Sequence, residues 1–119
     1  MKRKRILIAD DDDAILSLIS LVLNKEGFDT DTVSNGKDAL EKKNKNKYDL
    51  VILDIVMPLM FGTDAAKEIR QKTDCPIMFL TARSTDEDKL EAYGSGGDDY
   101  LQKPFSTIEL LLRVKALLK

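Results

Sequence analysis

Three carboxylates lie at the ends of short apolar runs, where they could take part in chemistry. Asp54 ends the run 48–54, and Asp10 and Asp11 follow the run 5–9. If the fold brings these side chains together, their charges repel strongly unless a cation lies among them. Hard oxygen ligands without histidine or thiolate suit Mg²⁺. We therefore expect a magnesium site at Asp10, Asp11 and Asp54.

Two further apolar runs end in groups that complement these acids. Thr81 follows the run 76–80 and offers a hydroxyl donor, while Lys103 follows the run 98–101 and offers an ammonium group. A divalent cation, a lysine and a hydroxyl around one carboxylate would make a cradle for a phosphoryl group, with the carboxylate as nucleophile. Asp54 is the residue best placed for that role.

Each of these groups also has an ordinary structural explanation. Acids between a strand and a helix often cap the helix, and we assign that role to Asp12 and Asp13. A threonine such as Thr81 is more often a cap, and a lysine such as Lys103 is more often a solvated surface charge. The chemical interpretation depends on whether the fold brings the groups together.

The composition excludes several other functions. The 119 residues include no histidine, so Ser-His-Asp catalysis, His-ligated zinc and acid–base chemistry on imidazole are excluded, and any phosphohistidine must belong to a partner. The single cysteine, Cys75, cannot form an intramolecular disulfide, which fits the cytoplasm. The net charge of −2 argues against a dedicated nucleic-acid surface, and no apolar segment approaches membrane-spanning length.

Short apolar runs alternate with helical patterns along the chain. The expected strands are 5–9, 28–33, 48–54, 76–80 and 98–101, and the expected helices are one from the cap Asp13 to the stop at Gly27, then 37–43, 63–71, 85–93 and 106–119. The alternation predicts an α/β fold, a doubly wound five-stranded parallel sheet with five helices, in one domain over 1–119. In the strand order 2-1-3-4-5, the ends of the first and third strands form a crevice, which would place Asp10 and Asp11 beside Asp54.

Four fragments in this order resemble the receiver domain of two-component response regulators. They are Ile-Ala-Asp-Asp-Asp at 8–12, Leu-Asp-Ile-Val-Met-Pro at 53–58, Phe-Leu-Thr-Ala-Arg at 79–83 and Asp-Asp-Tyr-Leu-Gln-Lys-Pro-Phe at 98–105. The resemblance covers essentially the whole chain, implies the flavodoxin-like receiver fold, and is closest in kind to the OmpR/PhoB type.

The resemblance implies a role for each site residue. Asp54 would accept a phosphoryl group from the phosphohistidine of a sensor histidine kinase, and the domain would itself catalyse this transfer and the later hydrolysis without being an enzyme otherwise. Asp11 and Asp54 would bind Mg²⁺ directly, Val56 would add its backbone carbonyl, and Asp10 would act mostly through water. Lys103 would neutralise the phosphoryl oxygens, held by a cis peptide bond to Pro104.

The resemblance also implies how the signal leaves the site. Thr81 would turn toward the phosphoryl group, and Tyr100 would move inward into the space that it leaves. The helix 85–93, the strand 98–101 and the helix 106–119 would then form a symmetric homodimer. Its intermolecular salt bridges would come from Lys89, Asp99, Glu109 and Arg113, and its apolar centre from Leu90, Tyr93 and Leu112. An ordinary charged helix surface is the simpler alternative.

The chain departs from the family pattern at a few positions. Gly94 replaces an acid that usually pairs with Lys115 in a third bridge. Leu59 and Phe61 stand where Gly and Asp are frequent, in the loop after Asp54. These two apolar residues could serve kinase docking or shield the acyl phosphate, and the sequence does not choose between the two.

We expect the regulatory half of a DNA-binding transcription regulator, with no DNA contact by these residues themselves. Three alternatives remain at this point. One is a free-standing receiver that signals through protein contacts, and another is a pseudo-receiver that never meets phosphate. The third is a small Mg²⁺-dependent phosphohydrolase of the haloacid-dehalogenase type, suggested by the Asp-x-Asp at 10–12.

Overall fold

The structure is a computed structural model and describes residues 3–119. Within that range the strands are β1 (Arg5–Ala9), β2 (Asp29–Val33), β3 (Leu50–Leu53), β4 (Ile77–Thr81) and β5 (Asp99–Gln102), and the helices are α1 (Asp13–Lys25), α2 (Gly36–Lys45), α3 (Gly62–Arg70), α4 (Asp86–Gly94) and α5 (Thr107–Leu117). The strands are parallel in the order β2-β1-β3-β4-β5, which confirms the predicted fold. None of the described helices is long and apolar enough to cross a membrane.

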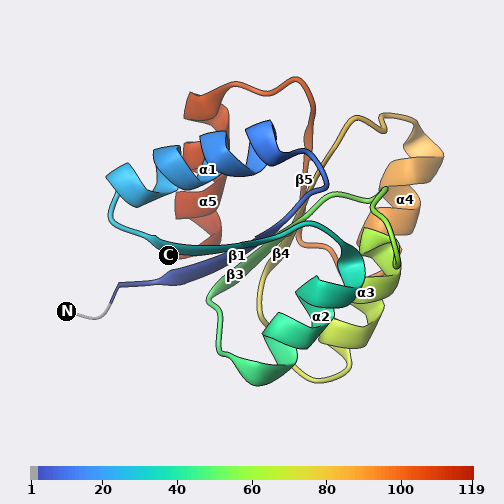
Figure 1. The fold of residues 1–119 in the computed structure, drawn as a ribbon. Helices are drawn as coiled ribbons and strands as arrows, with labels where there is room; N and C mark the ends of the chain where they lie inside the picture. The colour runs from blue at the N-terminus through green and yellow to red at the C-terminus, as the bar shows by residue number, and fades with distance from the viewer. Residues whose placement is uncertain (1–2) are drawn as a thin grey trace.

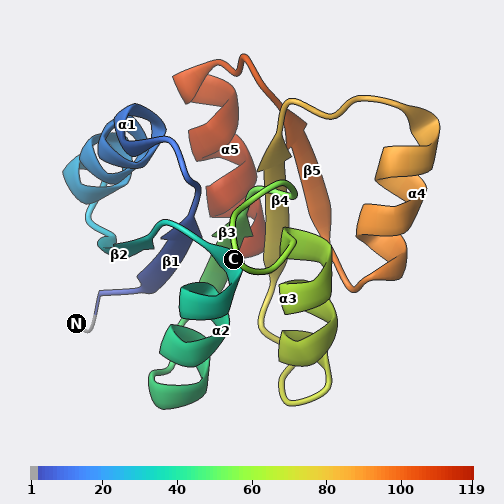
Figure 2. The ribbon, with the colours of Figure 1, turned by 45° about the vertical axis from the view of Figure 1, so that its right-hand side comes forward.

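The helices cover both faces of the sheet, and the sheet supplies side chains to two cores. Figures 1 and 2 show α1 and α5 on one face and α2, α3 and α4 on the other. Ile8 of β1 packs in the first core with Leu16 and Leu110, while its neighbour Leu7 packs in the second with Ala66. The central strands are therefore buried on both sides, as their continuous apolar sequences predict. The residues of β3 are at most 1% exposed, so Asp54 follows a rigid support.

The cap of α1 lies one residue before Asp13. Of the two acids expected to cap the helix, Asp12 is confirmed and Asp13 is wrong, because Asp12 has the extended backbone of a cap and its carboxylate accepts hydrogen bonds from the N–H groups of Ala14 and Ile15. The backbone N–H of Asp12 donates to Oδ1 of Asp10 at 2.9 Å. The start of the helix therefore also fixes the Asp10 carboxylate at the edge of the sheet.

A polar cluster joins β1, β2 and the start of β3 at the far edge of the sheet. The Tyr48 hydroxyl donates to Oδ2 of Asp31 at 2.6 Å, and Nη2 of Arg5 contacts the same oxygen at 2.9 Å. The Arg5 guanidinium also lies 4.9 Å from the centre of the Tyr48 ring. Burial and the neighbouring Asp31 raise the pKa of Tyr48 to about 12, and the Tyr48 hydrogen bond lowers the pKa of Asp31.

Replacing Tyr48 with Phe is expected to lower the free energy of unfolding by about 1 kcal/mol near neutral pH. The loss lies below the usual range for a hydrogen bond to a charged group because Asp31 is partly exposed to water. A carboxylate with a lowered pKa stabilises the fold above its unfolded pKa, and this contribution disappears as the pH falls through the folded pKa. Urea unfolding near neutral pH and at about pH 3 should therefore show a difference between wild type and variant that shrinks in acid. A difference of equal size at both pH values would contradict the prediction, and Tyr93→Phe on the exposed face is the control.

Candidate phosphoacceptor site

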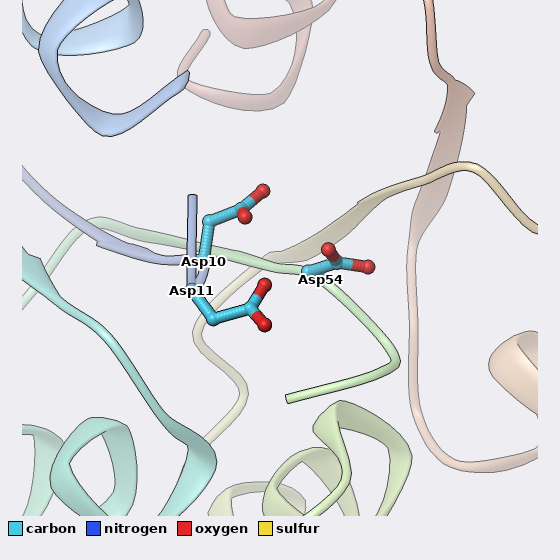
Figure 3. Close-up of side chains that lie close together, drawn as sticks. All are labelled: Asp10, Asp11 and Asp54. Carbon is cyan, nitrogen blue, oxygen red and sulfur yellow. The ribbon is translucent and has the colours of Figure 1, made fainter. Parts of the chain in front are cut away.

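Three carboxylates converge at the carboxyl ends of β1 and β3. Ligand oxygens of Asp10, Asp11 and Asp54 all lie within 4.8 Å of one another. Figure 3 shows Asp10 and Asp11 at the end of β1 and Asp54 at the end of the adjacent β3. Asp10 and Asp54 are buried, whereas Asp11 is exposed. The parallel pairing of β1 and β3 is what brings together residues more than forty positions apart in the sequence.

Lys103 reaches this cluster from the loop after β5. Its Nζ lies 2.6 Å from Oδ2 of Asp10 and 3.0 Å from Oδ2 of Asp54. Its backbone N–H donates to the carbonyl of Thr81 at 2.8 Å, which ties this loop to the end of β4. The Lys103–Pro104 peptide bond is cis, as the resemblance implied. One ammonium group thus bridges carboxylates from two strands.

The electrostatics of the site follow from burial and close charges. Burial raises the pKa of Asp10, and the charge of Asp54 adds to this, although the hydrogen bonds from Lys103 and Asp12 oppose it. Burial alone would lower the pKa of Lys103, but its hydrogen bonds and ion pairs with Asp10 and Asp54 outweigh burial and raise it. Lys103 is therefore cationic at neutral pH.

Lys103 contributes one ammonium group to a cluster of three carboxyl groups. The donor set consists of hard oxygens, and the ligand oxygens lie close enough to share one ion. This combination fits Mg²⁺, which prefers carboxylates and retains several waters. Val56 lies in the exposed loop just after Asp54, and a role for its backbone carbonyl remains a prediction.

The loop after β3 turns back sharply over Asp54. The backbone N–H of Ile55 donates to Oδ1 of Asp54 at 2.7 Å, and the N–H of Gly62 donates to the carbonyl of Ile55 at 2.8 Å. A Cβ on Gly62 would lie 1.9 Å from the backbone oxygen of Asp54. Gly62 is thus a residue of the site that sequence reasoning noted only as part of a loop.

Thr81 and Tyr100 are linked through the backbone of one residue, Arg83. The Thr81 hydroxyl accepts a hydrogen bond from the Arg83 N–H at 3.3 Å, and the Tyr100 hydroxyl donates to the Arg83 carbonyl at 2.5 Å. Both side chains are buried, and the Tyr100 ring lies 6.4 Å from that of Tyr93. The loop that follows β4 therefore connects the end of β4 with β5.

Three of the four charged residues of the predicted dimer face pair with one another within the chain. Nη1 of Arg113 lies 2.6 Å from Asp99, its Nη2 lies 3.1 Å from Glu109, and Nζ of Lys89 lies 6.0 Å from the centre of the Tyr100 ring. The three apolar residues of the face are exposed, namely Leu90, Tyr93 and Leu112. Lys115, which lacks its usual partner, lies 3.5 Å from Glu26 of α1.

The family model of the response regulator receiver domain matches residues 6–115. The chain belongs to this family. Among curated relatives, the CpxR homolog of Haemophilus influenzae is 44% identical over 115 residues, covering 97% of this chain and 50% of that protein. YvrH of Bacillus subtilis is 44% identical over 120 residues, covering 100% of this chain and 51% of that protein. Both are named transcriptional regulatory proteins, as expected for the OmpR/PhoB type, and the chain spans about half their length.

Solved receiver structures match over nearly the whole chain. A two-component response regulator from Clostridium difficile superposes with a TM-score of 0.94 at 38% identity, covering 98% of this chain and 96% of that one. TrrA from Thermotoga maritima, in complex with Mg²⁺-BeF, has a TM-score of 0.88 at 44% identity, covering 97% and 99%. Membership of the receiver family rules out the haloacid-dehalogenase alternative.

Proposed function

We propose that residues 1–119 act as one receiver domain in which Asp54 accepts a phosphoryl group from the phosphohistidine of a sensor histidine kinase. The observation that carries this proposal is the contact of one ammonium, that of Lys103, with both Asp10 and Asp54 in the cluster of acids that could hold a metal ion. An oxygen of Asp54 forms the new bond to phosphorus while the bond from phosphorus to the histidine nitrogen breaks. Such transfers need positioning and charge stabilisation more than covalent help from other side chains.

The backbone and side-chain groups around Asp54 would contribute to the transfer in different ways. The Ile55 N–H orients one carboxylate oxygen, and the Lys103 ammonium lies where it can balance charge on the phosphoryl oxygens. Asp11 and Asp54 would hold Mg²⁺ directly, with the carbonyl of Val56 as a further ligand and Asp10 acting through water. When bound, Mg²⁺ supplies charge neutralisation at the transferring group.

Labelling with acetyl phosphate tests this function. With Mg²⁺ present, wild type should gain the mass of one phosphoryl group, and chelation of Mg²⁺ should prevent the gain. Asp54→Asn should remain unlabelled because the amide cannot form the acyl phosphate. A wild-type protein that takes up no label would support the pseudo-receiver, and equal labelling of the variant would place the nucleophile elsewhere.

To reach Asp54, the sensor kinase must cover the end of the sheet where the strands have their carboxyl ends. An apolar groove of about 380 Å³ lies beside Lys103, between α1 and the loop after β5. Its other lining residues are Ile15, Leu18, Ala82, Pro104 and Phe105. We propose that this groove belongs to the surface that the sensor kinase contacts, since it opens next to the phosphoacceptor. With such a partner, we expect the domain to act in the cytoplasm.

Phosphorylation would be transmitted through the Arg83 backbone. The Thr81 hydroxyl accepts from the Arg83 N–H and keeps its own proton free to donate, so turning the side chain to donate to a phosphoryl oxygen would disturb this contact. The carbonyl of Arg83 accepts a hydrogen bond from the Tyr100 hydroxyl. A shift of the Arg83 backbone would therefore also change the position of the Tyr100 ring. The bistable element would then be α4, β5 and α5.

The expected output is a homodimer through that face, in a regulator whose DNA-binding part lies outside these residues; a free-standing receiver is the alternative. Dimerisation would exchange the in-chain pairs of Arg113 for pairs between subunits and bury Leu90, Tyr93 and Leu112.

Beryllofluoride with Mg²⁺ is therefore expected to shift the chain from monomer to dimer in analytical ultracentrifugation. Leu112→Lys should raise the dimer dissociation constant at least about tenfold, since it places a charge in the apolar centre. Leu21→Lys on α1 is a matched exposed control and should leave the constant unchanged. A monomer in both states would favour the free-standing receiver.

A further inference from the structure

The loop beside Asp54 contains a leucine in a backbone conformation that suits glycine. Leu59 has a φ of 69° and is the one non-glycine residue of the described chain with a positive φ. For an L-residue with a side chain this conformation costs roughly 1–2 kcal/mol. The Leu59 side chain recovers little of this cost by packing, because it is 77% exposed.

Two residues after Leu59, the N-cap position of helix α3 holds a residue whose side chain cannot cap it. Phe61 is the N-cap of α3 and makes no side-chain cap hydrogen bond. The other helices all have capping side chains, from Asp12, Asn35, Thr85 and Ser106. Replacing a capping residue with an apolar one costs about 1 kcal/mol, and Phe61 is 52% exposed.

Val56, Leu59 and Phe61 together form what we call the apolar rim. All three lie in the segment between Asp54 and α3, and all three are exposed. Two of them break a local preference of the backbone without gaining burial inside the chain. Strain and poor local choices that persist next to a reactive group point to a contact that the isolated chain does not make.

We propose that the apolar rim is a second contact, besides the groove next to Lys103, by which this receiver recognises its protein phosphodonor. This inference rests on the proposed function of Asp54. Asp54 is only 7% exposed, and transfer requires the phosphorus to approach its oxygen to about 3–3.5 Å. A protein carrying the phosphohistidine must therefore cover the loop that begins at Ile55, so the rim is continuous with the surface used in transfer. The donor should present apolar side chains beside its phosphohistidine.

The double variant Leu59→Gly/Phe61→Asp tests the inference. It gives the loop its locally preferred residues, so it should fold and resist urea at least as well as wild type. Acetyl phosphate is too small to touch the rim, and it should label the variant within about twofold of the wild-type rate. The protein donor is chosen by testing autophosphorylated cytoplasmic portions of the histidine kinases from the same genome on wild type. With the fastest of these, kcat/KM of the variant should fall at least about tenfold, the effect of losing apolar anchors at an interface.

Ile108→Gln on α5 is the matched control, with a side chain of similar exposure, and should retain the wild-type rate with both donors. An unchanged kinase rate in the double variant would overturn the inference and leave the proposed function intact. If the labelling rate of the double variant fell equally with both donors, or if its acyl phosphate were hydrolysed faster, the inference would also be overturned. Either result would show that the rim acts on the site itself. If neither acetyl phosphate nor any of the kinases labelled wild type, the proposed function itself would be overturned.

Discussion

Lys103→Met is expected to slow labelling of Asp54 by acetyl phosphate by about 10²–10³-fold, the usual effect of removing one preorganised charge-stabilising donor. Methionine retains much of the length and the apolar stem of lysine, so packing changes little. The ammonium that contacts Asp10 at 2.6 Å and Asp54 at 3.0 Å is lost. Stopped-flow or mass-spectrometric labelling at saturating Mg²⁺ measures the effect. A rate within threefold of wild type would show that Lys103 does not act on the phosphoryl group.

The same change should also destabilise the fold, because it leaves Asp10 and Asp54 without their cation. Removing one partner of a buried ion pair typically costs about 3–5 kcal/mol, and we expect the lower part of that range since Lys103 is partly hydrated. The pKa of Lys103 is raised in the folded state, so its contribution is present below the usual pKa of 10.5 and is lost as the pH rises through the folded value. The difference between wild type and variant should therefore be full at neutral pH and shrink in strong base.

Asp10→Asn separates the two effects of Lys103. Burial already disfavours the Asp10 carboxylate, as its raised pKa shows, so the amide should relieve the repulsion that Lys103→Met creates. The double variant is expected to regain most of the lost stability without regaining the labelling rate. If stability and labelling returned together, the slow labelling of Lys103→Met would be a consequence of misfolding.

Gly62→Ala is expected to reduce labelling by at least about tenfold, because a displacement of about 1 Å at a reacting group can cost 10²-fold. The added Cβ would lie 1.9 Å from the backbone oxygen of Asp54 and 3.1 Å from Cα of Ile55. The loop cannot simply move outward, since the Gly62 N–H is bonded to the Ile55 carbonyl. We expect the overpacking to lower the free energy of unfolding by about 1–3 kcal/mol.

Gly94→Ala is the matched control for this prediction. A Cβ on Gly94 meets nothing within 4 Å, and the residue ends α4. This substitution should leave labelling unchanged and stability the same or slightly higher. If the Gly62→Ala variant were labelled at the wild-type rate, the backbone around Asp54 could shift without consequence for the reaction.

The sequence predicted those features that depend on repeated local signals. The continuous apolar runs identified the buried strands, and Gly27, with a φ of 94°, ends α1 as expected. The convergence of Asp10 and Asp11 on Asp54 followed from strand order alone. The sequence could not separate Asp12 from Asp13 as the cap because the two are chemically identical, and only the backbone dihedrals decide which side chain covers the first turn.

Other features depend on distances that no sequence pattern reports. The crowding of Gly62 against Asp54 needs the fold of a loop, although a glycine at the start of a helix was an available signal. The Arg83 backbone link between Thr81 and Tyr100 involves main-chain groups, which every residue shares. The resemblance marked Arg113, Asp99 and Glu109 as partners between subunits, yet it could not reveal that these residues also pair within one chain.

The central claim is that Asp54, rather than a carboxylate at the end of β1, carries the phosphoryl group. Borohydride reduces an acyl phosphate to an alcohol and so converts the labelled aspartate to homoserine, which peptide mass spectrometry can locate. After labelling with acetyl phosphate and Mg²⁺, we expect conversion of Asp54 and none without Mg²⁺. Conversion of Asp10 or Asp11 in place of Asp54 would contradict the account.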